Sequence, residues 1–233
     1  MDTIQRTTIA IATALLVGLT AAGCTTDGTP GANGTTASSA PPVAATSTPA
    51  VDPSTTPAPS PSAAPASIPT ACTDVVDSAT YAATMGSTPL NDPDFFAGRP
   101  MGQLTPSAPP AGASAGDVVT AATQLDCGWR DPRADITGLF VSIGGLGTAT
   151  EADYQAWLLD RGNLAPVAQE AGASYSCAPG RGGTVCQLAY TESFYGVDIA
   201  DTVLMRDGVV VSVSQANHPT NNLMGALVTR IWG

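Results

Sequence analysis

A long segment without aromatic residues or cations, from Thr25 to Thr70, confines any globular fold to the last part of the chain. It consists mainly of Thr, Ser, Pro, Ala and Gly, and its only charged residues are Asp27 and Asp52. Such a segment cannot bury enough apolar surface to offset the entropy lost on ordering, and its prolines favour extended conformations. We therefore predict a disordered linker over residues 24–70 and a single globular domain over residues 71–233.

An export signal is predicted before this linker. Arg6 lies in a short polar start, Ile9–Thr20 is an uncharged apolar run, and the small residues 21–23 follow it. This order is typical of a signal peptide. The apolar run is shorter than the roughly 20 residues that span a bilayer. An uncleaved membrane anchor is the alternative if Thr7–Gly23 is counted as one stretch, and we predict a signal peptide over residues 1–23.

The quartet Ala21-Ala22-Gly23-Cys24 resembles the lipobox of bacterial lipoproteins. This resemblance implies that the sulfur of Cys24 receives diacylglycerol, that the anchor carries acyl chains such as palmitate, and that Cys24 becomes the first residue of the mature chain. We expect a protein anchored to the outer face of the cell membrane, with the linker holding its domain away from the bilayer. A stray thiol in a tail is the alternative for Cys24.

The charge balance excludes two classes of partner. The chain has a formal net charge of -11, with eight Lys and Arg residues, all of them Arg. Nucleic acid binding requires clustered cations that displace counterions, and attraction to anionic lipid headgroups requires a basic surface. We therefore expect no nucleic acid partner and membrane association only through the lipid on Cys24.

Four cysteines remain in the predicted domain: Cys72, Cys127, Cys177 and Cys186. An exported chain with an even number of cysteines is expected to form disulfides, and three connectivities are possible. Cys177 and Cys186 flank the turn sequence APGRGGTV, so we pair them across a hairpin, which leaves Cys72 to pair with Cys127. A four-cysteine zinc site is the alternative, but no CxxC spacing supports it and we predict no metal site.

The pattern of apolar residues predicts an α+β domain, with an antiparallel sheet and about three helices. The sequence RDG at residues 206–208 predicts a hairpin turn. The Gly- and Pro-rich residues 86–117 predict an irregular excursion, in which the side chains of Phe95, Phe96 and Leu104 are tucked down onto the domain. Helical spacing occurs over residues 73–84, 151–161 and the end of the chain after His218, where Leu223, Leu227 and Ile231 are four apart. Strand patterns cover residues 122–130, 137–143, 173–176, 184–191, 197–206 and 209–215.

One motif suggests catalysis. The sequence GASAG at residues 112–116 matches the G-x-S-x-G pattern, and Ser114 with His218 would give a small secreted serine hydrolase as the alternative function. No strand precedes the motif, so we predict no catalytic residue and place His218 at the start of the last helix. Two further groups have structural explanations. The carboxylates Asp198, Asp201 and Asp207 are expected on a solvated strand edge, and Trp129, Trp157 and Trp232 in the core.

The signal, lipobox and Pro/Thr-rich linker together resemble the cell-envelope lipoproteins of high-GC Gram-positive bacteria. Within the domain, PTACTDVV and LDCGWRD resemble the cysteine and C-x-W elements of the actinobacterial DUF3558-type lipoprotein family. This resemblance implies disulfides at Cys72 and Cys127 and an α+β fold, and it carries no catalytic residues.

These observations predict a membrane-anchored lipoprotein that displays a non-catalytic binding domain without a cofactor. The expected partner is a small molecule, a cell-wall polymer or an envelope protein, and the expected site is one well-formed apolar cleft.

Overall fold

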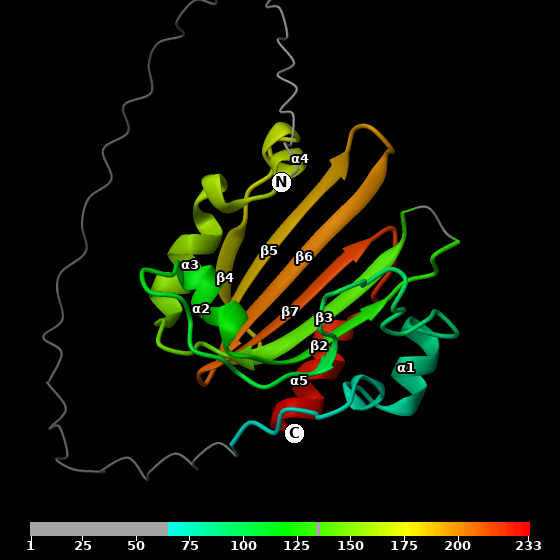
Figure 1. Ribbon diagram of the computed structural model, residues 1–233, viewed down its shortest axis with the longest axis horizontal. Helices are drawn as coiled ribbons and strands as arrows, with labels where there is room; N and C mark the ends of the chain where they lie inside the picture. Colours follow the sequence, from blue (N-terminus) through cyan, green and yellow to red (C-terminus); the bar gives the residue numbers. More distant parts are fainter. Residues whose placement is uncertain (1–64, 134–135) are drawn as a thin grey trace, which may run out of the picture. The chain divides into compact units, whose positions relative to one another are not determined.

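The computed structural model describes residues 65–133 and 136–233, which form an antiparallel sheet with helices around it (Figure 1). The predicted signal peptide, Cys24 and the linker up to residue 64 lie outside the described residues. Within the described part of the chain, no helix has both the length and the apolar character needed to cross a membrane. The α+β class and the antiparallel sheet are confirmed.

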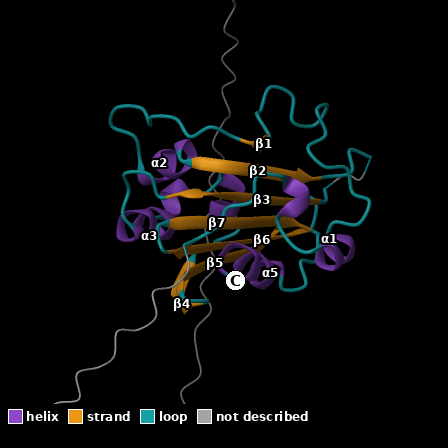
Figure 2. Ribbon diagram, turned by 90° about the horizontal axis from the view of Figure 1, so that it is seen from below, coloured by secondary structure: helices purple, strands orange, loops and turns teal. Residues whose placement is uncertain are grey.

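The sheet has seven strands in the order β1-β2-β3-β7-β6-β5-β4, which Figure 2 shows from one edge to the other. All neighbouring strands are antiparallel. The hairpin pairs β2–β3, β4–β5, β5–β6 and β6–β7 are local in sequence, whereas β3–β7 joins distant parts of the chain. The strands are β1 (Gly102–Gln103), β2 (Thr123–Trp129), β3 (Gly138–Gly145), β4 (Ser176–Gly180), β5 (Gly183–Glu192), β6 (Val197–Arg206) and β7 (Val209–Ala216).

The helices are more numerous than expected. The described residues contain five α-helices and two short 3₁₀ helices, whereas the sequence predicts about three helices. They are η1 (Cys72–Asp74), α1 (Ser78–Thr84), α2 (Ala115–Ala121), α3 (Glu151–Leu159), η2 (Arg161–Asn163), α4 (Pro166–Glu170) and α5 (Leu223–Trp232).

Local capping explains why the first predicted helix is interrupted. The carboxylate of Asp77 accepts hydrogen bonds from the backbone N–H groups of Ala79 and Thr80, at 3.0 and 2.9 Å. Asp77 is therefore the N-cap of α1 rather than a residue inside a helix over 73–84. Helix α3 begins in the same way, because Thr150 and Asp153 form a capping box at its start.

The predicted boundary at Ala71 is too late by a few residues. Ala66 and Ile68 pack against the apolar core, and the Ser67 N–H donates to the Ile231 carbonyl at 2.8 Å. The last residues of the expected linker are therefore fixed against α5. Strand β4 is also displaced, since it begins at Ser176 instead of covering residues 173–176.

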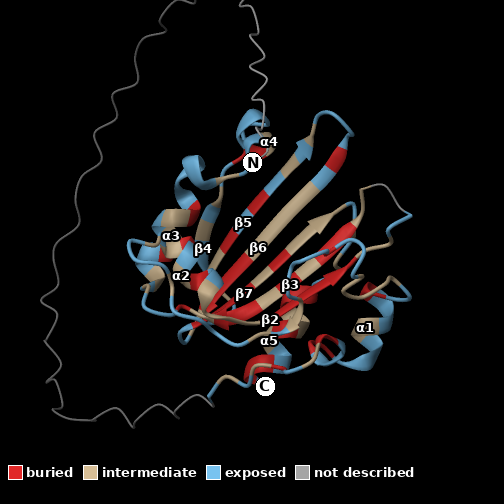
Figure 3. Ribbon diagram, in the orientation of Figure 1, coloured by how far each residue is buried: buried red, intermediate tan, exposed pale blue. Residues whose placement is uncertain are grey.

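One face of the sheet, which we call the α5 face, carries the larger apolar core. Side chains alternate across a strand, so residues such as Leu125, Val141 and Val211 point to the same side. They pack against Leu227 and Ile231 of α5, and all five residues are at most 2% exposed. Figure 3 shows buried stretches along β2 and β3, and α5 lies behind the sheet in the view of Figure 1.

The opposite face, which we call the cavity face, is covered less completely. A smaller core forms where Val119 of α2 and Tyr154 and Leu158 of α3 pack on Val203 and Met205 of β6. Both helices lie at one end of the sheet, while α1 lies at the other end (Figures 1 and 2). The rest of this face is bordered by the segment between α1 and α2.

The two disulfides join the pairs that the sequence predicts. Cys72 bonds Cys127 with Cα atoms 5.6 Å apart, which ties η1 to β2 in the core of the α5 face. Cys177 bonds Cys186 with Cα atoms 4.0 Å apart, and the two residues are direct cross-strand neighbours in β4 and β5.

Candidate functional site

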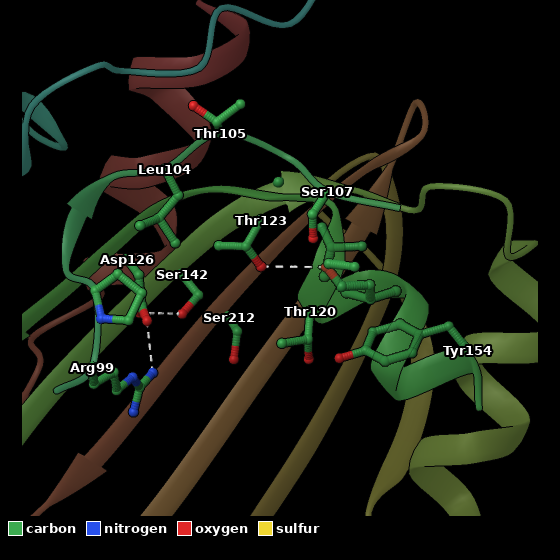
Figure 4. Close-up of a pocket in the computed structure, with 15 residues that line it drawn as sticks. Arg99, Leu104, Thr105, Ser107, Thr120, Thr123, Asp126, Ser142, Tyr154 and Ser212 are labelled. Carbon is green, nitrogen blue, oxygen red and sulfur yellow. Dashed lines mark hydrogen bonds and ion pairs between the residues drawn. The ribbon is translucent and has the colours of Figure 1, made fainter. Parts of the chain in front are cut away.

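A cavity of about 650 Å³ lies on the cavity face, where the sheet meets α2, α3 and the segment over residues 99–107 (Figure 4). The strands supply its floor, and the helices and the segment supply its walls. The lining residues are Arg99, Pro100, Leu104, Thr105, Ser107, Val119, Thr120, Ala121, Thr123, Asp126, Ser142, Gly144, Tyr154, Val210 and Ser212.

Strand register sets a row of polar side chains into the floor. Asp126 of β2 pairs with Ser142 of β3, and Ser142 pairs with Ser212 of β7. Directly paired residues point to the same face of a sheet, so the three polar groups lie side by side. A neighbouring hollow of about 280 Å³ shares Ser142 and Ser212 and extends the floor to Ser214.

A buried carboxylate is held at one side of the floor. The Asp126 side chain is only 8% exposed, and one of its oxygens accepts a hydrogen bond from Arg99 Nη2 at 2.6 Å. The other oxygen accepts from Ser142 Oγ at 2.7 Å (Figure 4). Because the Arg99 side chain is 56% exposed, the ion pair lies at the rim of the cavity with the guanidinium toward solvent.

The hydroxyl groups of the cavity fall into two sets. Thr120 donates to the Gly116 carbonyl at 2.8 Å and Thr123 donates to the Val119 carbonyl at 3.3 Å, so both are occupied. The hydroxyls of Tyr154 and Ser212 form no hydrogen bond with another described residue, and Tyr154 points into the cavity in Figure 4. Burial, with a smaller effect of the Asp201 charge, raises the pKa of Tyr154 to about 12, so its hydroxyl stays protonated at neutral pH and can donate.

The wall formed by residues 99–107 is fixed by backbone hydrogen bonds. The Leu104 N–H donates to the Gln124 carbonyl at 2.8 Å, and the Ser107 N–H donates to the Ala121 carbonyl at 2.8 Å. Leu104 is half-buried and lines the cavity, as its predicted inward position requires. The expectation of a purely irregular excursion is wrong, because this region contains β1 and the first residues of α2.

The two phenylalanines of the excursion have different environments. Phe96 is 7% exposed and lies so close to Gly128 that a Cβ at that position would overlap its ring. Phe95 is 39% exposed, which corrects the expectation that it is tucked down, and the Arg130 guanidinium lies 3.9 Å from its ring centroid. Phe96 therefore anchors the excursion to the sheet, while Phe95 contributes a surface contact.

The structure does not bring Ser114 and His218 together. The Ser114 hydroxyl caps α2 in a capping box with Asp117, and a nitrogen of the His218 ring lies 2.8 Å from the Thr84 carbonyl oxygen at the end of α1. Helices α1 and α2 are at opposite ends of the sheet in both views (Figures 1 and 2). The GASAG motif is the start of a helix rather than a strand-to-helix turn that lifts a nucleophile.

The three carboxylates expected at a solvated edge have separate positions. Asp198 is exposed and accepts a hydrogen bond from Thr191, and Asp207 lies in the β6–β7 turn with a φ of 51°. Asp201 lies in β6, an inner strand, with its side chain on the cavity face beside Ser214 of β7. Asp198 and Asp201 both belong to this inner strand, so the expected edge position is wrong for both, and only Asp198 is exposed as expected. Strand order rather than sequence position decides which residues lie at an edge.

The tryptophans pack as expected, with one qualification. Trp129 and Trp232 are 0% and 8% exposed and belong to the core of the α5 face. Trp157 is half-buried against the core of the cavity face, and a Cβ at Gly116 would overlap its ring. Gly116 therefore permits the close contact between α2 and α3.

None of the functional residues predicted from the sequence lines the cavity of about 650 Å³, which we call the larger cavity, so sequence reasoning missed this site. One signal was present, because Asp126 lies between two apolar residues in a strand and must point to the face opposite theirs. The partners Ser142 and Ser212 cannot be found in this way, since their alignment depends on strand pairing between distant segments. Within residues 65–133 and 136–233, no group of three or more His, Cys, Asp or Glu side chains is placed to hold a metal ion.

Comparisons with known proteins add no assignment to this geometry. No protein-family model, no curated protein and no solved structure matches the chain.

Proposed function

We propose that this protein is a lipid-anchored extracytoplasmic binding protein whose larger cavity holds a small, uncharged molecule rich in hydroxyl groups. The observation that carries the proposal is the polar floor of a cavity of about 650 Å³. Cavities that bind small molecules typically measure about 300–1,000 Å³.

The chemistry of the lining supports an uncharged ligand. Arg99 and Asp126 are the only charged residues of the lining, and they form an ion pair with each other. A charged ligand would have to compete with this pair and lose its own hydration. A neutral ligand can bind without disturbing it.

The same lining supports a ligand with many hydroxyl groups. A serine or tyrosine hydroxyl both donates and accepts, so Tyr154 and Ser212 can each pair with a ligand hydroxyl in either direction. The apolar side chains of Leu104, Val119 and Val210 lie in the same cavity and suit the C–H surface of a sugar ring. A sugar unit of a cell-wall polymer is the ligand class that combines both surfaces.

A binding role fits the lining better than catalysis does. The described residues of the lining include no histidine and no cysteine, and their single carboxylate, Asp126, is held by Arg99 and Ser142. General acid–base catalysis requires a group that is free to exchange a proton with the substrate. The proposed ligand is therefore held rather than converted.

The location rests on the sequence. The apolar run and the lipobox that ends at Cys24 predict the lipid anchor. The Pro-rich segment after Cys24 predicts a spacer. A tethered domain of this kind would meet cell-wall polymers at the outer face of the membrane.

Native mass spectrometry of the protein purified from its own membranes tests both parts. We expect a mature chain that starts at Cys24 and carries fatty-acyl mass, together with a bound small molecule. Ser212→Ile fills the floor of the cavity and should remove that molecule, whereas Ser176→Ile makes the same change at an exposed strand position outside it and should not.

The two parts fail independently. A different first residue or the absence of acyl mass would contradict the anchor and leave the cavity argument intact. A bound molecule that survives Ser212→Ile, or wild-type protein that carries no molecule at all, would contradict the binding proposal.

A further inference from the structure

A second, smaller cavity lies on the same face of the sheet, between α3, α4 and strands β5 and β6. Its volume is about 160 Å³, and none of its lining residues belongs to the larger cavity. Tyr154 lines the larger cavity and Trp157 lines the smaller one, and the two rings stack with centroids 5.7 Å apart and an interplanar angle of 12°. This stack is a shared wall, so the two cavities are separate sites.

Aromatic rings and one carboxylate dominate the smaller cavity. Trp157, Tyr175 and Tyr190 contribute rings from three different parts of the chain, and Asp201 contributes the only charge. Leu164 and Leu188 complete the apolar surface. The small volume restricts any ligand to a few non-hydrogen atoms, well below the roughly 300 Å³ of ordinary small-molecule sites.

The carboxylate of Asp201 has an unused acceptor. Its Oδ2 accepts a hydrogen bond from the Tyr175 hydroxyl at 3.3 Å. Its buried Oδ1 has no partner within 3.5 Å among the described residues, although the hydroxyl of Ser214, the residue paired with Asp201 across β6 and β7, is near enough to lower the pKa of the carboxyl. A buried acceptor without a partner is unfavourable, and such groups are uncommon in folded proteins. Because Asp201 lines the cavity, its incompletely paired carboxylate can accept a further hydrogen bond or ion pair there.

Among the residues that the structure describes, no cation lines the cavity to balance this charge. Arg161, which lies between α3 and α4, is exposed, and its guanidinium donates to the Gln169 carbonyl at 3.1 Å. The cavity thus combines one unbalanced negative charge with three electron-rich ring systems.

We propose that the smaller cavity binds a small organic cation, an ammonium group with methyl or methylene substituents. The Asp201 carboxylate holds its charge, and the rings of Trp157, Tyr175 and Tyr190 surround its alkyl surface. Rings of this kind attract cations through their negative faces, and aromatic pockets recognise alkylated ammonium groups for this reason.

The lining selects this ligand class over two others. A metal ion such as calcium requires about six to eight oxygen ligands, and here a single carboxylate is present. An anion would meet the Asp201 charge and no cation. An alkylammonium group satisfies the carboxylate and fills the apolar remainder of the cavity.

Binding should strengthen as the pH rises. Burial raises the pKa of the Asp201 carboxyl above its ordinary value, and the nearby Ser214 and Tyr175 hydroxyls only partly oppose this effect. The titratable groups that face Asp201 are Tyr154, Tyr175 and Tyr190, whose pKa values burial raises, so they remain neutral at neutral pH. Only the ionised carboxylate attracts a cation, so protonation of Asp201 at low pH opposes binding.

The test is an NMR titration of the full mature chain with choline and with 3,3-dimethyl-1-butanol, in which carbon replaces the nitrogen of choline. We expect choline to shift the methyl signals of Leu164 and Leu188 and to bind at least about tenfold more tightly than its neutral analogue. Equal binding of the two compounds, or no binding of choline and tetramethylammonium, would overturn the proposal.

Two variants and one control identify the site. Asp201→Asn keeps the size of the side chain and should weaken choline binding at least about tenfold, and Tyr190→Leu should weaken it while keeping the charge. Asp198→Asn removes an exposed charge from the same strand and should leave the affinity unchanged. Affinity that survives both Asp201→Asn and Tyr190→Leu would contradict the assigned cavity. Because no lining residue is shared, these outcomes do not depend on the ligand proposed for the larger cavity.

Discussion

The two faces of the sheet are built from the same strands but differ in what covers them. On the α5 face, apolar side chains of β2, β3 and β7 pack against the apolar stripe of α5 and are buried there. On the cavity face, the alternate residues of those strands include Asp126, Ser142 and Ser212, and α2 and α3 cover only one end.

The different coverage of the two faces suggests that the α5 face contributes mainly to stability and the cavity face mainly to ligand binding. A face whose apolar side chains pack against a helix gains free energy from the apolar surface that it removes from water. A face that carries polar groups and a cavity gives up part of that gain, and sites of this kind occur where ligands bind. We therefore expect substitutions on the α5 face to reduce stability and those on the cavity face to change ligand binding.

Removing each disulfide separately should give the largest losses of stability, and the two losses should differ. Cys72–Cys127 closes a separation of 55 residues and Cys177–Cys186 closes one of 9. Loop-closure entropy predicts losses of about 4 and about 2.5 kcal/mol in the free energy of unfolding for the two Cys→Ala double variants. Urea denaturation measures both values. A larger loss for the Cys177–Cys186 variant would contradict the loop-closure account of the difference.

Leucines on the two faces should respond differently to truncation. Leu227→Ala empties a fully buried position between α5 and the sheet and should cost about 3 kcal/mol. Leu104→Ala is the matched control at the wall of the larger cavity, where the side chain is half-buried, and should cost less than about 1 kcal/mol. Thermal and urea denaturation compare them. Equal losses would show that the wall at residues 99–107 is as tightly packed as the core.

Removing the Asp126 carboxylate from the polar floor should lower the free energy of unfolding. Asp126→Ala removes the acceptor of Arg99 and Ser142 from a buried site and should cost about 2 kcal/mol. Asp131→Ala removes a carboxylate from an exposed pair with Arg133 and should have no measurable effect. If both variants unfold like the wild type, the ion pair at the rim does not organise the cavity.

Asp201→Asn should stabilise the protein slightly at neutral pH. A carboxyl whose folded pKa lies above the unfolded value of 3.8 favours folding when it is protonated, and this contribution is lost as the pH rises through the folded pKa. At pH 7 the asparagine variant avoids a buried charge and should gain about 1 kcal/mol, while below pH 3.8 the difference should disappear. Urea denaturation at both pH values, with Asp198→Asn as the control, measures the change. A loss of stability at pH 7 would show that the charged carboxylate is favourable in the unliganded protein.

Local patterns predicted much of the fold and little of the candidate site. The spacing of Leu223, Leu227 and Ile231 identified α5, and the turn around Asp207 identified the β6–β7 hairpin. These features depend on neighbouring residues and so can be found in one sequence. Helix α4 has only five residues and escaped the periodicity argument.

The site depends on distant residues instead. The pairing of β3 with β7 aligns Ser142 with Ser212, and the packing of α3 on β6 encloses Asp201. Neither the alternation of residues nor a motif indicates which strands become neighbours. For this reason the partners of Asp126 were not identified, and Asp201 was placed at a solvated edge.

Hydrogen exchange of backbone amides in the full mature chain tests the comparison of the two faces most directly. Amides of α5 should exchange only through global unfolding, whereas amides of α2 and of residues 99–107 should exchange through local opening at a lower free energy. A ligand in the larger cavity should slow exchange at α2 and leave α5 unchanged. Equal opening free energies for α2 and α5 would contradict the division of stability and binding between the two faces.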